Sequence, residues 1–301
     1  MNNLNKRLKL FSILTTIGMI IVLLQGALVT KTESGQGCGD SWPLCHGQVI
    51  PETINTLETI IEYSHRAVSA ILGIMVIILA IWMWKKLPHV RETKLLAIIA
   101  ILFIIFQGLL GAAAVMWGQS SAVLALHFGF SLVSFASVLL LTILVFEEDK
   151  GPQVRSPRIS LSFKWFIYFV FTYLYLVVYT GALVRHTGSS LACAGWPLCN
   201  GQIIPPLKAN IAVQFGHRVA AALMFIVIIA LVIHVYRYYK DEITLRYTVV
   251  ISLILVSIQV LSGAYVVFTQ LSLLSSMLHA FIITCLFGTI SYLVMLATRA
   301  K

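Results

Sequence analysis

An acid, a histidine and an arginine stand close together near the start of one long apolar stretch. In "TIIEYSHRAVSAILG", residues 59–73, Glu62 precedes His65 by three positions and Arg66 follows directly. A step of three residues places Glu62 and His65 on one face of a helix, about 4.5 Å apart along its axis. A carboxylate in an apolar helix is costly unless it has a function or a partner. Because Arg66 is only one position beyond His65, we expect it to point away from Glu62, which favours proton transfer over an ion pair.

A second copy of this pattern keeps the histidine and the arginine but lacks the acid. In "IAVQFGHRVAAALMF", residues 211–225, His217 and Arg218 recur, and Gln214 stands where the first copy has Glu62. An amide forms hydrogen bonds but takes up no proton at neutral pH. The two copies therefore predict one site with a potential base and one without it. We interpret the first as a reaction site and the second as an electron-transfer site.

Two further histidines complete two equivalent pairs. The spacing from His65 to His217 equals the spacing from His127 to His279. Two histidines at similar depth on two helices of a four-helix bundle can face each other across its core, where bundles hold cofactors. Neutral imidazoles on both sides suit a haem iron, whereas zinc takes three or four ligands. The alternative is a set of core histidines that are hydrogen-bonded or hydrated, which two equivalent pairs of intramembrane histidines disfavour.

The composition is that of an integral membrane protein. Of the 301 residues, 59% are hydrophobic and only 11% are charged, and the mean hydropathy is +0.94. A membrane-spanning helix needs about 20 apolar residues, and eight stretches meet this requirement. These stretches are 9–30, 60–84, 95–117, 122–146, 164–186, 211–236, 247–269 and 272–297. The sequence therefore predicts an all-α integral membrane protein with eight transmembrane helices, the first of them a retained helix and not a signal peptide.

The basic residues predict the orientation in the lipid bilayer. The net charge is +10, and most Lys and Arg residues fall in the two termini and in alternate short loops. Cytoplasmic loops carry such an excess, so we expect a multi-pass protein of the cell membrane with both termini cytoplasmic. The charge forms no continuous basic face, and nucleic acid is therefore not an expected partner.

The chain is internally duplicated. "GALVTKTESGQGCGDSWPLCHGQVIP", residues 26–51, matches "GALVRHTGSSLACAGWPLCNGQIIP", residues 181–205. Each copy contains four predicted helices, an even number, so the two copies have the same orientation. We expect two tandem four-helix bundles, 1–148 and 164–301, joined by a cytoplasmic linker, 149–163. Parallel repeats of this kind are related by a pseudo-two-fold axis along the membrane normal.

The matching loops each contain two cysteines around a "WPLC" motif. On the outer side of the membrane, disulfides within each loop are the default, namely Cys38–Cys45 and Cys193–Cys199. Each would stabilise the fold by about 2–4 kcal/mol. The spacing leaves cross-pairing between the loops open. A redox-active Cys38/Cys45 pair is the alternative to a structural brace.

Two further residue types recur in both copies. Arg66 and Arg218 could contact haem propionates, or they could extend to the lipid headgroups. Gln107 and Gln259 lie within apolar helices, where we expect them to form interhelical hydrogen bonds.

Over essentially its whole length the sequence resembles the bacterial haem A synthases, cytochrome oxidase assembly enzymes with eight spans in two four-helix halves. The resemblance is carried by "EYSHR" with Glu62 and His65, "LHFGFSL" with His127, "FGHR" with His217, "LHAF" with His279, and the loop motif "GCGDSWPLC". The paired loop cysteines match the form of the family that has them.

The resemblance implies a role for each histidine pair. His217 and His279 would bind a haem b cofactor, and His65 and His127 would flank the substrate, haem o. Glu62 would be the catalytic carboxylate. The implied reaction oxidises one porphyrin methyl group to a formyl group, giving haem a. Because an iron with two histidine ligands has no free axial site for dioxygen, we expect the oxygen to come from water, unless a histidine leaves the iron. The farnesyltransferase that makes haem o is an expected partner, and the electron acceptor is not identified by the sequence.

Two other classes of protein compete with this interpretation. A bis-His di-haem electron-transfer protein, similar to cytochrome b561, would explain the four histidines but not the contrast between Glu62 and Gln214. A haem or small-molecule transporter would explain the repeat, but the sequence shows no broken helices that would form an alternating-access site.

Overall fold

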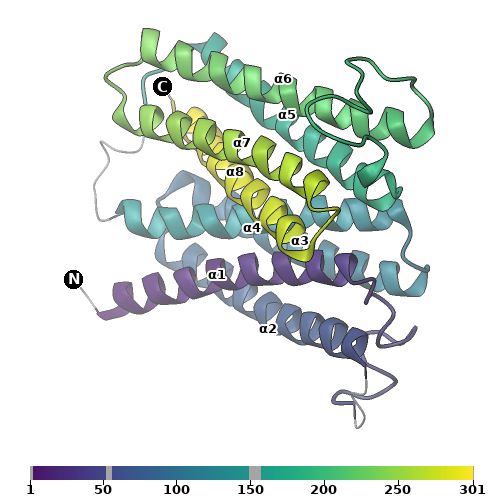
Figure 1. The fold of residues 1–301 in the computed structure, drawn as a ribbon. Coiled ribbons are helices and arrows are strands. Elements are labelled where there is room, and N and C mark those ends of the chain that lie inside the picture. Colours follow the sequence, from purple (N-terminus) through teal and green to yellow (C-terminus); the bar gives the residue numbers. More distant parts are fainter. Residues whose placement is uncertain (1–2, 52–55, 149–156, 301) are drawn as a thin grey trace. The chain divides into compact units, whose positions relative to one another are not determined.

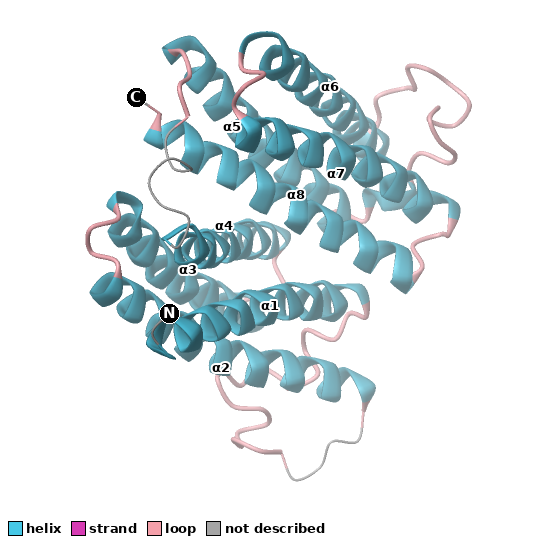
Figure 2. Ribbon diagram, turned by 90° about the vertical axis from the view of Figure 1, so that its left-hand side faces the viewer, coloured by secondary structure: helices cyan, strands magenta, loops and turns pink. Residues whose placement is uncertain are grey.

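The computed structural model describes residues 3–51, 56–148 and 157–300, and within these ranges its regular elements are helices (Figures 1 and 2). The eight long helices are α1 (Asn3–Lys31), α2 (Leu57–Lys86), α3 (Arg91–Met116), α4 (Ser121–Glu147), α5 (Leu161–His186), α6 (Ala209–Tyr238), α7 (Ile243–Phe268) and α8 (Leu273–Arg299). A short 3₁₀ helix, Ser189–Leu191, follows α5. The predicted all-α class with eight helices is confirmed.

Every one of these helices is long and apolar enough to cross a membrane. Large apolar side chains remain exposed along them, as at Ile71, Ile74, Ile78 and Ile81 of α2. Their spacing of three or four residues gives a stripe along one face of the helix, which lipid tails would cover. The chain is therefore a multi-pass membrane protein.

Helices α2 and α5 begin earlier than the apolar stretches alone predict, because Thr56 and Ser160 cap them. Ser160 accepts a hydrogen bond from the backbone N–H of Phe163 at 3.2 Å, so α5 begins at Leu161 and not at residue 164. The last residues of the predicted linker, 149–163, thus belong to this helix and its cap. Residues 149–156 of that linker lie outside the described residues.

The chain divides into two compact units, Met1–Val145 and Phe146–Lys301. In the first unit, α2 packs against α1 and α3. Thr142 of α4 hydrogen-bonds to Thr16 of α1 at 2.8 Å, and the rings of Phe103 in α3 and Phe130 in α4 lie 5.1 Å apart. These contacts close a four-helix arrangement.

The second unit is a four-helix bundle of its own. Helix α5 packs against α6 and α8, and α7 packs against α6 and α8. The hydroxyl group of Tyr173 in α5 donates to the backbone carbonyl of Ala220 in α6 at 3.0 Å, and Phe171 packs against Phe287 of α8. Each unit thus brings its second and fourth helices into one bundle. The pseudo-two-fold axis between the units stays a prediction.

Candidate functional site

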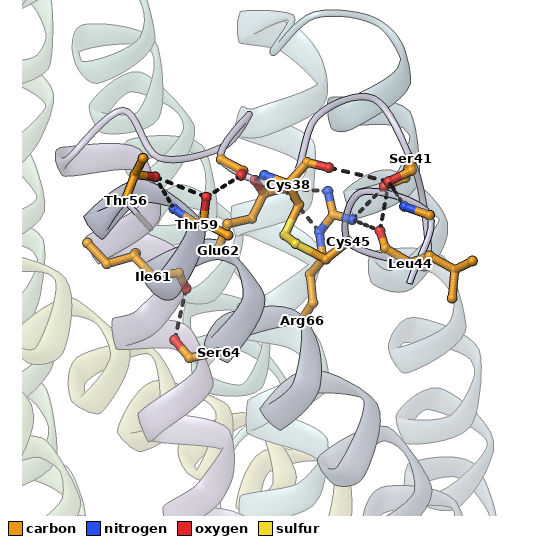
Figure 3. The surroundings of a disulfide bond; sticks show 12 residues. Cys38, Ser41, Leu44, Cys45, Thr56, Thr59, Ile61, Glu62, Ser64 and Arg66 are labelled. Atoms are coloured by element: carbon orange, nitrogen blue, oxygen red, sulfur yellow. Dashed lines mark hydrogen bonds and ion pairs between the residues drawn. A yellow bond between two sulfur atoms is a disulfide. The ribbon is translucent and has the colours of Figure 1, made fainter. Parts of the chain in front are cut away.

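Glu62 is buried under the loop that precedes its helix, with only 3% of its surface exposed. Its Oε2 accepts a hydrogen bond from the backbone N–H of Cys38 at 2.7 Å. Its Oε1 accepts two hydrogen bonds from Arg66, from Nε at 3.0 Å and from Nη2 at 2.5 Å (Figure 3). Glu62 therefore fastens the loop to α2 and also forms an ion pair.

The prediction that Arg66 points away from Glu62 is wrong. The two residues are four positions apart, about one helical turn, and this spacing places their side chains on the same face. The other end of the guanidinium group, Nη1, donates to the backbone carbonyls of Ser41 at 2.6 Å and Leu44 at 2.7 Å. Arg66 thus links Glu62 to the loop that lies above it.

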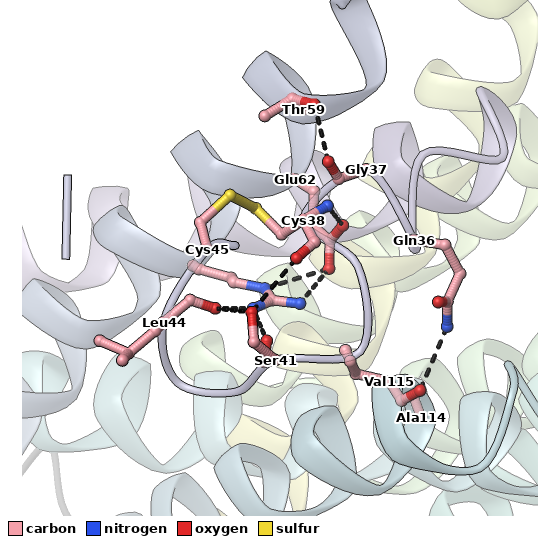
Figure 4. A network of polar contacts seen from close by, with 12 residues as sticks. Gln36, Gly37, Cys38, Ser41, Leu44, Cys45, Thr59, Glu62, Ala114 and Val115 are labelled. Carbon is pink, nitrogen blue, oxygen red and sulfur yellow. Dashed lines mark hydrogen bonds and ion pairs between the residues drawn. A yellow bond between two sulfur atoms is a disulfide. The ribbon is translucent and has the colours of Figure 1, made fainter. Parts of the chain in front are cut away.

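That loop, the first disulfide loop (residues 38–45), contacts α2 at Glu62 and Arg66. Its approach to the helix is fixed at Gly37, whose carbonyl accepts a hydrogen bond from the Thr59 hydroxyl at 2.6 Å (Figure 4). A Cβ atom at Gly37 would collide with the backbone carbonyl group of Glu58. Only glycine therefore permits this close contact between loop and helix.

The second copy holds its loop in a similar way with an amide in place of the acid. Gln214 is 4% exposed, its Oε1 accepts from the N–H of Cys193 at 2.5 Å, and its Nε2 donates to the carbonyl of Ser190 at 2.6 Å. Arg218 donates to the carbonyls of Cys193 at 3.0 Å and Leu198 at 3.2 Å. The second disulfide loop (residues 193–199) is thereby fastened to α6.

Each loop is closed by its own disulfide bond, Cys38–Cys45 in the first and Cys193–Cys199 in the second. The prediction of pairing within each loop is confirmed, and cross-pairing between the loops is excluded. In both loops the backbone N–H of the first cysteine also donates a hydrogen bond to the buried side chain, Glu62 in the first loop and Gln214 in the second. The disulfide and the buried side chain therefore fix the same end of each loop.

The first histidine pair lies within the first unit, with His65 in α2 and His127 in α4. The two imidazoles lie close enough to interact electrostatically. The Nδ1 atom of each ring is buried without a hydrogen-bond partner, although the backbone of Gln107 lies near His127. Both residues are of intermediate exposure, as are the two histidines of the second pair.

The second pair, His217 in α6 and His279 in α8, has the same placement but different neighbours. The two imidazoles again lie within electrostatic range of each other. His217 Nδ1 lies 2.8 Å from the hydroxyl oxygen of Thr180, and His279 Nδ1 lies 2.8 Å from that of Ser262. The amide Nε2 of Gln259 also approaches His279 Nε2 at 3.1 Å. Thr180 and Ser262 were not among the predicted site residues.

The two predicted glutamine contacts differ in outcome. Gln259 of α7 contacts His279 of α8, so the predicted interhelical hydrogen bond is confirmed there. Within the described residues the side chain of Gln107 forms no such bond, and its Oε1 atom, like that of Gln259, is buried without a hydrogen-bond partner.

A glycine of the neighbouring helix lies against each histidine ring. An added Cβ would lie 3.4 Å from the ring carbon Cε1 of His65 at Gly26, 3.5 Å from that of His127 at Gly111, 3.0 Å from that of His217 at Gly181 and 3.4 Å from that of His279 at Gly263. The four rings therefore pack edge-on against helix backbone. Small residues allow this close approach in membrane bundles.

These features fit two bis-histidine sites. A histidine that ligates iron through one nitrogen presents its other N–H to a neighbouring acceptor. The second pair has such acceptors in Thr180 and Ser262. Iron at His279 Nε2 would replace the contact with Gln259. At the first pair, the Nδ1 atoms of both imidazoles have no hydrogen-bond partner.

Known proteins match the chain over nearly its full length. The sequence pattern of the family described as "Cytochrome oxidase assembly protein" matches residues 9–291. The chain is 54% identical to "Heme A synthase" of Geobacillus kaustophilus over 298 residues, which cover 99% of this chain and 94% of that protein. It is 53% identical to "Heme A synthase" of Halalkalibacterium halodurans, covering 99% of each, and 52% identical to that of Alkalihalophilus pseudofirmus, covering 98% and 99%.

These matches cover nearly the whole chain, and so they include both disulfide loops and all eight helices. The chain therefore belongs to the cytochrome oxidase assembly protein family, alongside relatives that are named haem A synthases.

Proposed function

We propose that this protein is a haem A synthase, an oxidoreductase that converts a methyl group of haem o into the formyl group of haem a for cytochrome oxidase. The observation that carries the proposal is the contrast between Glu62 and Gln214. Both side chains fasten a disulfide loop beside a histidine pair, but only Glu62 can take up a proton. A protein that merely carried electrons would have no use for this difference.

In the proposed division of labour, His65 and His127 flank the substrate haem o, and His217 and His279 hold a resident haem b. Haem b, when bound, supplies an iron that accepts and passes on single electrons. The hydroxyl groups on the second pair support a permanent ligand site there. The unpartnered Nδ1 atoms of the first pair support a site whose occupant changes during turnover.

Glu62 is the proposed catalytic base. Its Oε1 atom accepts two hydrogen bonds from Arg66, whereas Oε2 accepts one, from Cys38. We therefore assign proton uptake from the reacting methyl group to Oε2. Water adds to the oxidised carbon, the electrons leave towards an acceptor that is still unidentified, and a second oxidation of the hydroxymethyl group gives the formyl group. Labelling with oxygen isotopes tests this route, because label from dioxygen in newly formed haem a would contradict it.

The two arginines remain proposed contacts for the haem propionates, and their surroundings differ. Arg66 is neutralised by Glu62 in the ion pair. Within the described part of the chain, Arg218 forms no ion pair with a carboxylate, and its guanidinium group donates only to the backbone carbonyls of Cys193 and Leu198. Its uncompensated charge makes Arg218 the better partner for an anionic propionate.

The proposed location is the cell membrane, with both termini in the cytoplasm, as the distribution of basic residues indicates. The proposed supplier of substrate is the farnesyltransferase that makes haem o, since such an apolar product passes most directly between two proteins in the bilayer.

Extraction of the haems from the purified protein, with identification by mass, tests the proposal. The synthase should contain haem b together with haem o, haem a or a hydroxylated intermediate. Two haem b groups per chain, in cells that also make haem o, would instead indicate the di-haem electron-transfer protein.

A further inference from the structure

The second histidine pair differs from the first in one repeated detail. Thr180 immediately precedes Gly181, the glycine that lies against His217, and Ser262 immediately precedes Gly263, the glycine that lies against His279. Each hydroxyl group therefore sits where the neighbouring helix comes closest to the imidazole, 2.8 Å from its Nδ1 atom.

Both hydroxyl groups donate a hydrogen bond to a backbone carbonyl of their own helix. Thr180 Oγ1 donates to the carbonyl of Val177 at 2.7 Å, and Ser262 Oγ donates to the carbonyl of Gln259 at 2.8 Å. A hydroxyl group has one proton to donate but two lone pairs with which to accept. Each oxygen can therefore only accept from the imidazole, so the Nδ1 atoms carry the proton. This tautomer leaves a lone pair on both Nε2 atoms that can bind a metal, at His279 in place of the contact with Gln259.

The first half has other side chains at the same two places. Gln25 precedes Gly26, and Leu110 precedes Gly111. The Oε1 atom of Gln25 is buried without a partner, and a leucine side chain accepts no hydrogen bond. The Nδ1 atoms of both histidines of the first half are buried without hydrogen-bond partners in the described residues.

We propose that Thr180 and Ser262 are positioning residues that make the second histidine pair a permanent haem site, and that Gln25 and Leu110 leave the first pair exchangeable. The proposal rests on the haem assignment of the proposed function. It explains how one chain can release a porphyrin product from one bundle while retaining a chemically similar cofactor in the other.

The physical basis is the strength of the imidazole as a ligand. An acceptor on Nδ1–H fixes the orientation of the ring and raises its basicity, which favours the ferric iron. Loss of such a partner typically weakens metal binding by about 10–100-fold. The same loss should raise the midpoint potential of the bound haem, because the weaker donor stabilises the ferric state less.

The test uses Thr180→Val and Ser262→Ala, singly and together, in the full-length protein, with Thr180→Ser as the conservative control. The transfer rate of haem b to a haem-scavenging apoprotein and the midpoint potential of the resident haem are measured. We expect transfer about 10–100-fold faster in the double variant and a raised potential. Thr180→Ser keeps the hydroxyl group and should behave as the unmodified protein.

Gln25→Thr combined with Leu110→Ser supplies the converse test in the first half. This variant should release haem o and haem a more slowly, with haem b unaffected. If the second-half variants do not accumulate, Gln25→Thr with Leu110→Ser tests the inference by itself. Unchanged release of haem o and haem a from this variant would then overturn the inference.

An unchanged transfer rate and potential in Thr180→Val/Ser262→Ala would also overturn it. Absence of haem b from the unmodified protein is a different result, because it contradicts the proposed function itself.

Discussion

Equivalent contacts fasten the two disulfide loops to their helices. The contacts of the two histidine pairs, in contrast, differ between the halves. In both halves a buried side-chain oxygen accepts the N–H of the first cysteine, and an arginine donates to the carbonyl of the leucine in "WPLC". Only the first half adds an acid, and only the second adds hydroxyl groups on the imidazoles. What the halves share is structural, and what separates them assigns proton transfer to one and haem retention to the other.

Two substitutions at Glu62 separate the loop anchor from the acid. Glu62→Ala removes both and leaves Arg66 buried without its partner, which should lower the free energy of unfolding by about 3–5 kcal/mol. Glu62→Gln keeps an acceptor for the N–H of Cys38, as Gln214 does for Cys193, and should destabilise the protein much less. Neither variant should form haem a. Thermal unfolding in detergent measures the difference, and equal destabilisation would contradict the anchor role.

Removal of the second disulfide tests whether the loops are structural braces. Cys193→Ser with Cys199→Ser should lower stability by about 2–4 kcal/mol if the ring of residues 193–199 acts as a covalent brace. Haem b should remain bound, because Gln214 and Arg218 still fasten the loop. Reductant should destabilise the unmodified protein in the same way. For the first loop, loss of turnover at full stability in Cys38→Ser with Cys45→Ser would point to a redox-active pair instead.

A methyl group at Gly181 should disturb the second histidine pair. Its Cβ would lie 3.0 Å from His217 Cε1, and overpacking of this kind costs about 1–3 kcal/mol. Gly181→Ala should therefore bind less haem b. Gly26→Ala should have a smaller effect on the first pair, because its added Cβ would lie 3.4 Å from His65 Cε1. Gly216→Ala is the matched control, since nothing lies within 4 Å of its added Cβ. Haem content by absorbance ranks the three variants, and equal haem content would contradict the packing argument.

Gln214→Glu should have the smallest effect on the reaction. It gives the second half an acid. The glutamate can still accept a hydrogen bond from the N–H of Cys193, but it loses the hydrogen bond that Gln214 donates to the carbonyl of Ser190. In the proposed division of labour haem o binds at the first pair, so this acid lies away from the methyl group that reacts. The rate of haem a formation should be unchanged, and new activity at the second pair would show that the acid alone distinguishes the two halves.

The sequence was sufficient for features that depend on local spacing. Apolar length predicted the eight helices, and the short separation of Cys38 from Cys45 favoured pairing within the loop. The contact of Arg66 with Glu62 could also have been predicted, because four positions make about one turn of a helix. The separation of Arg66 from His65 by one position does not determine whether Arg66 faces Glu62.

Contacts between helices could not be read from the sequence. A threonine or serine in an apolar helix most often hydrogen-bonds only its own backbone, so Thr180 and Ser262 carried no signal by themselves. Their meaning depends on which helix packs against the imidazole. The mismatches of Gln25 with Thr180 and of Leu110 with Ser262, each beside a matching pair of glycines, were the available signs that the halves differ there.

The most direct test of the division of labour is the haem composition of Glu62→Gln, purified from cells that supply haem o and analysed by mass. The account predicts haem b together with haem o, and neither haem a nor a hydroxylated intermediate. Haem a in the proportion found in the unmodified protein would contradict it, because oxidation would then proceed without the acid.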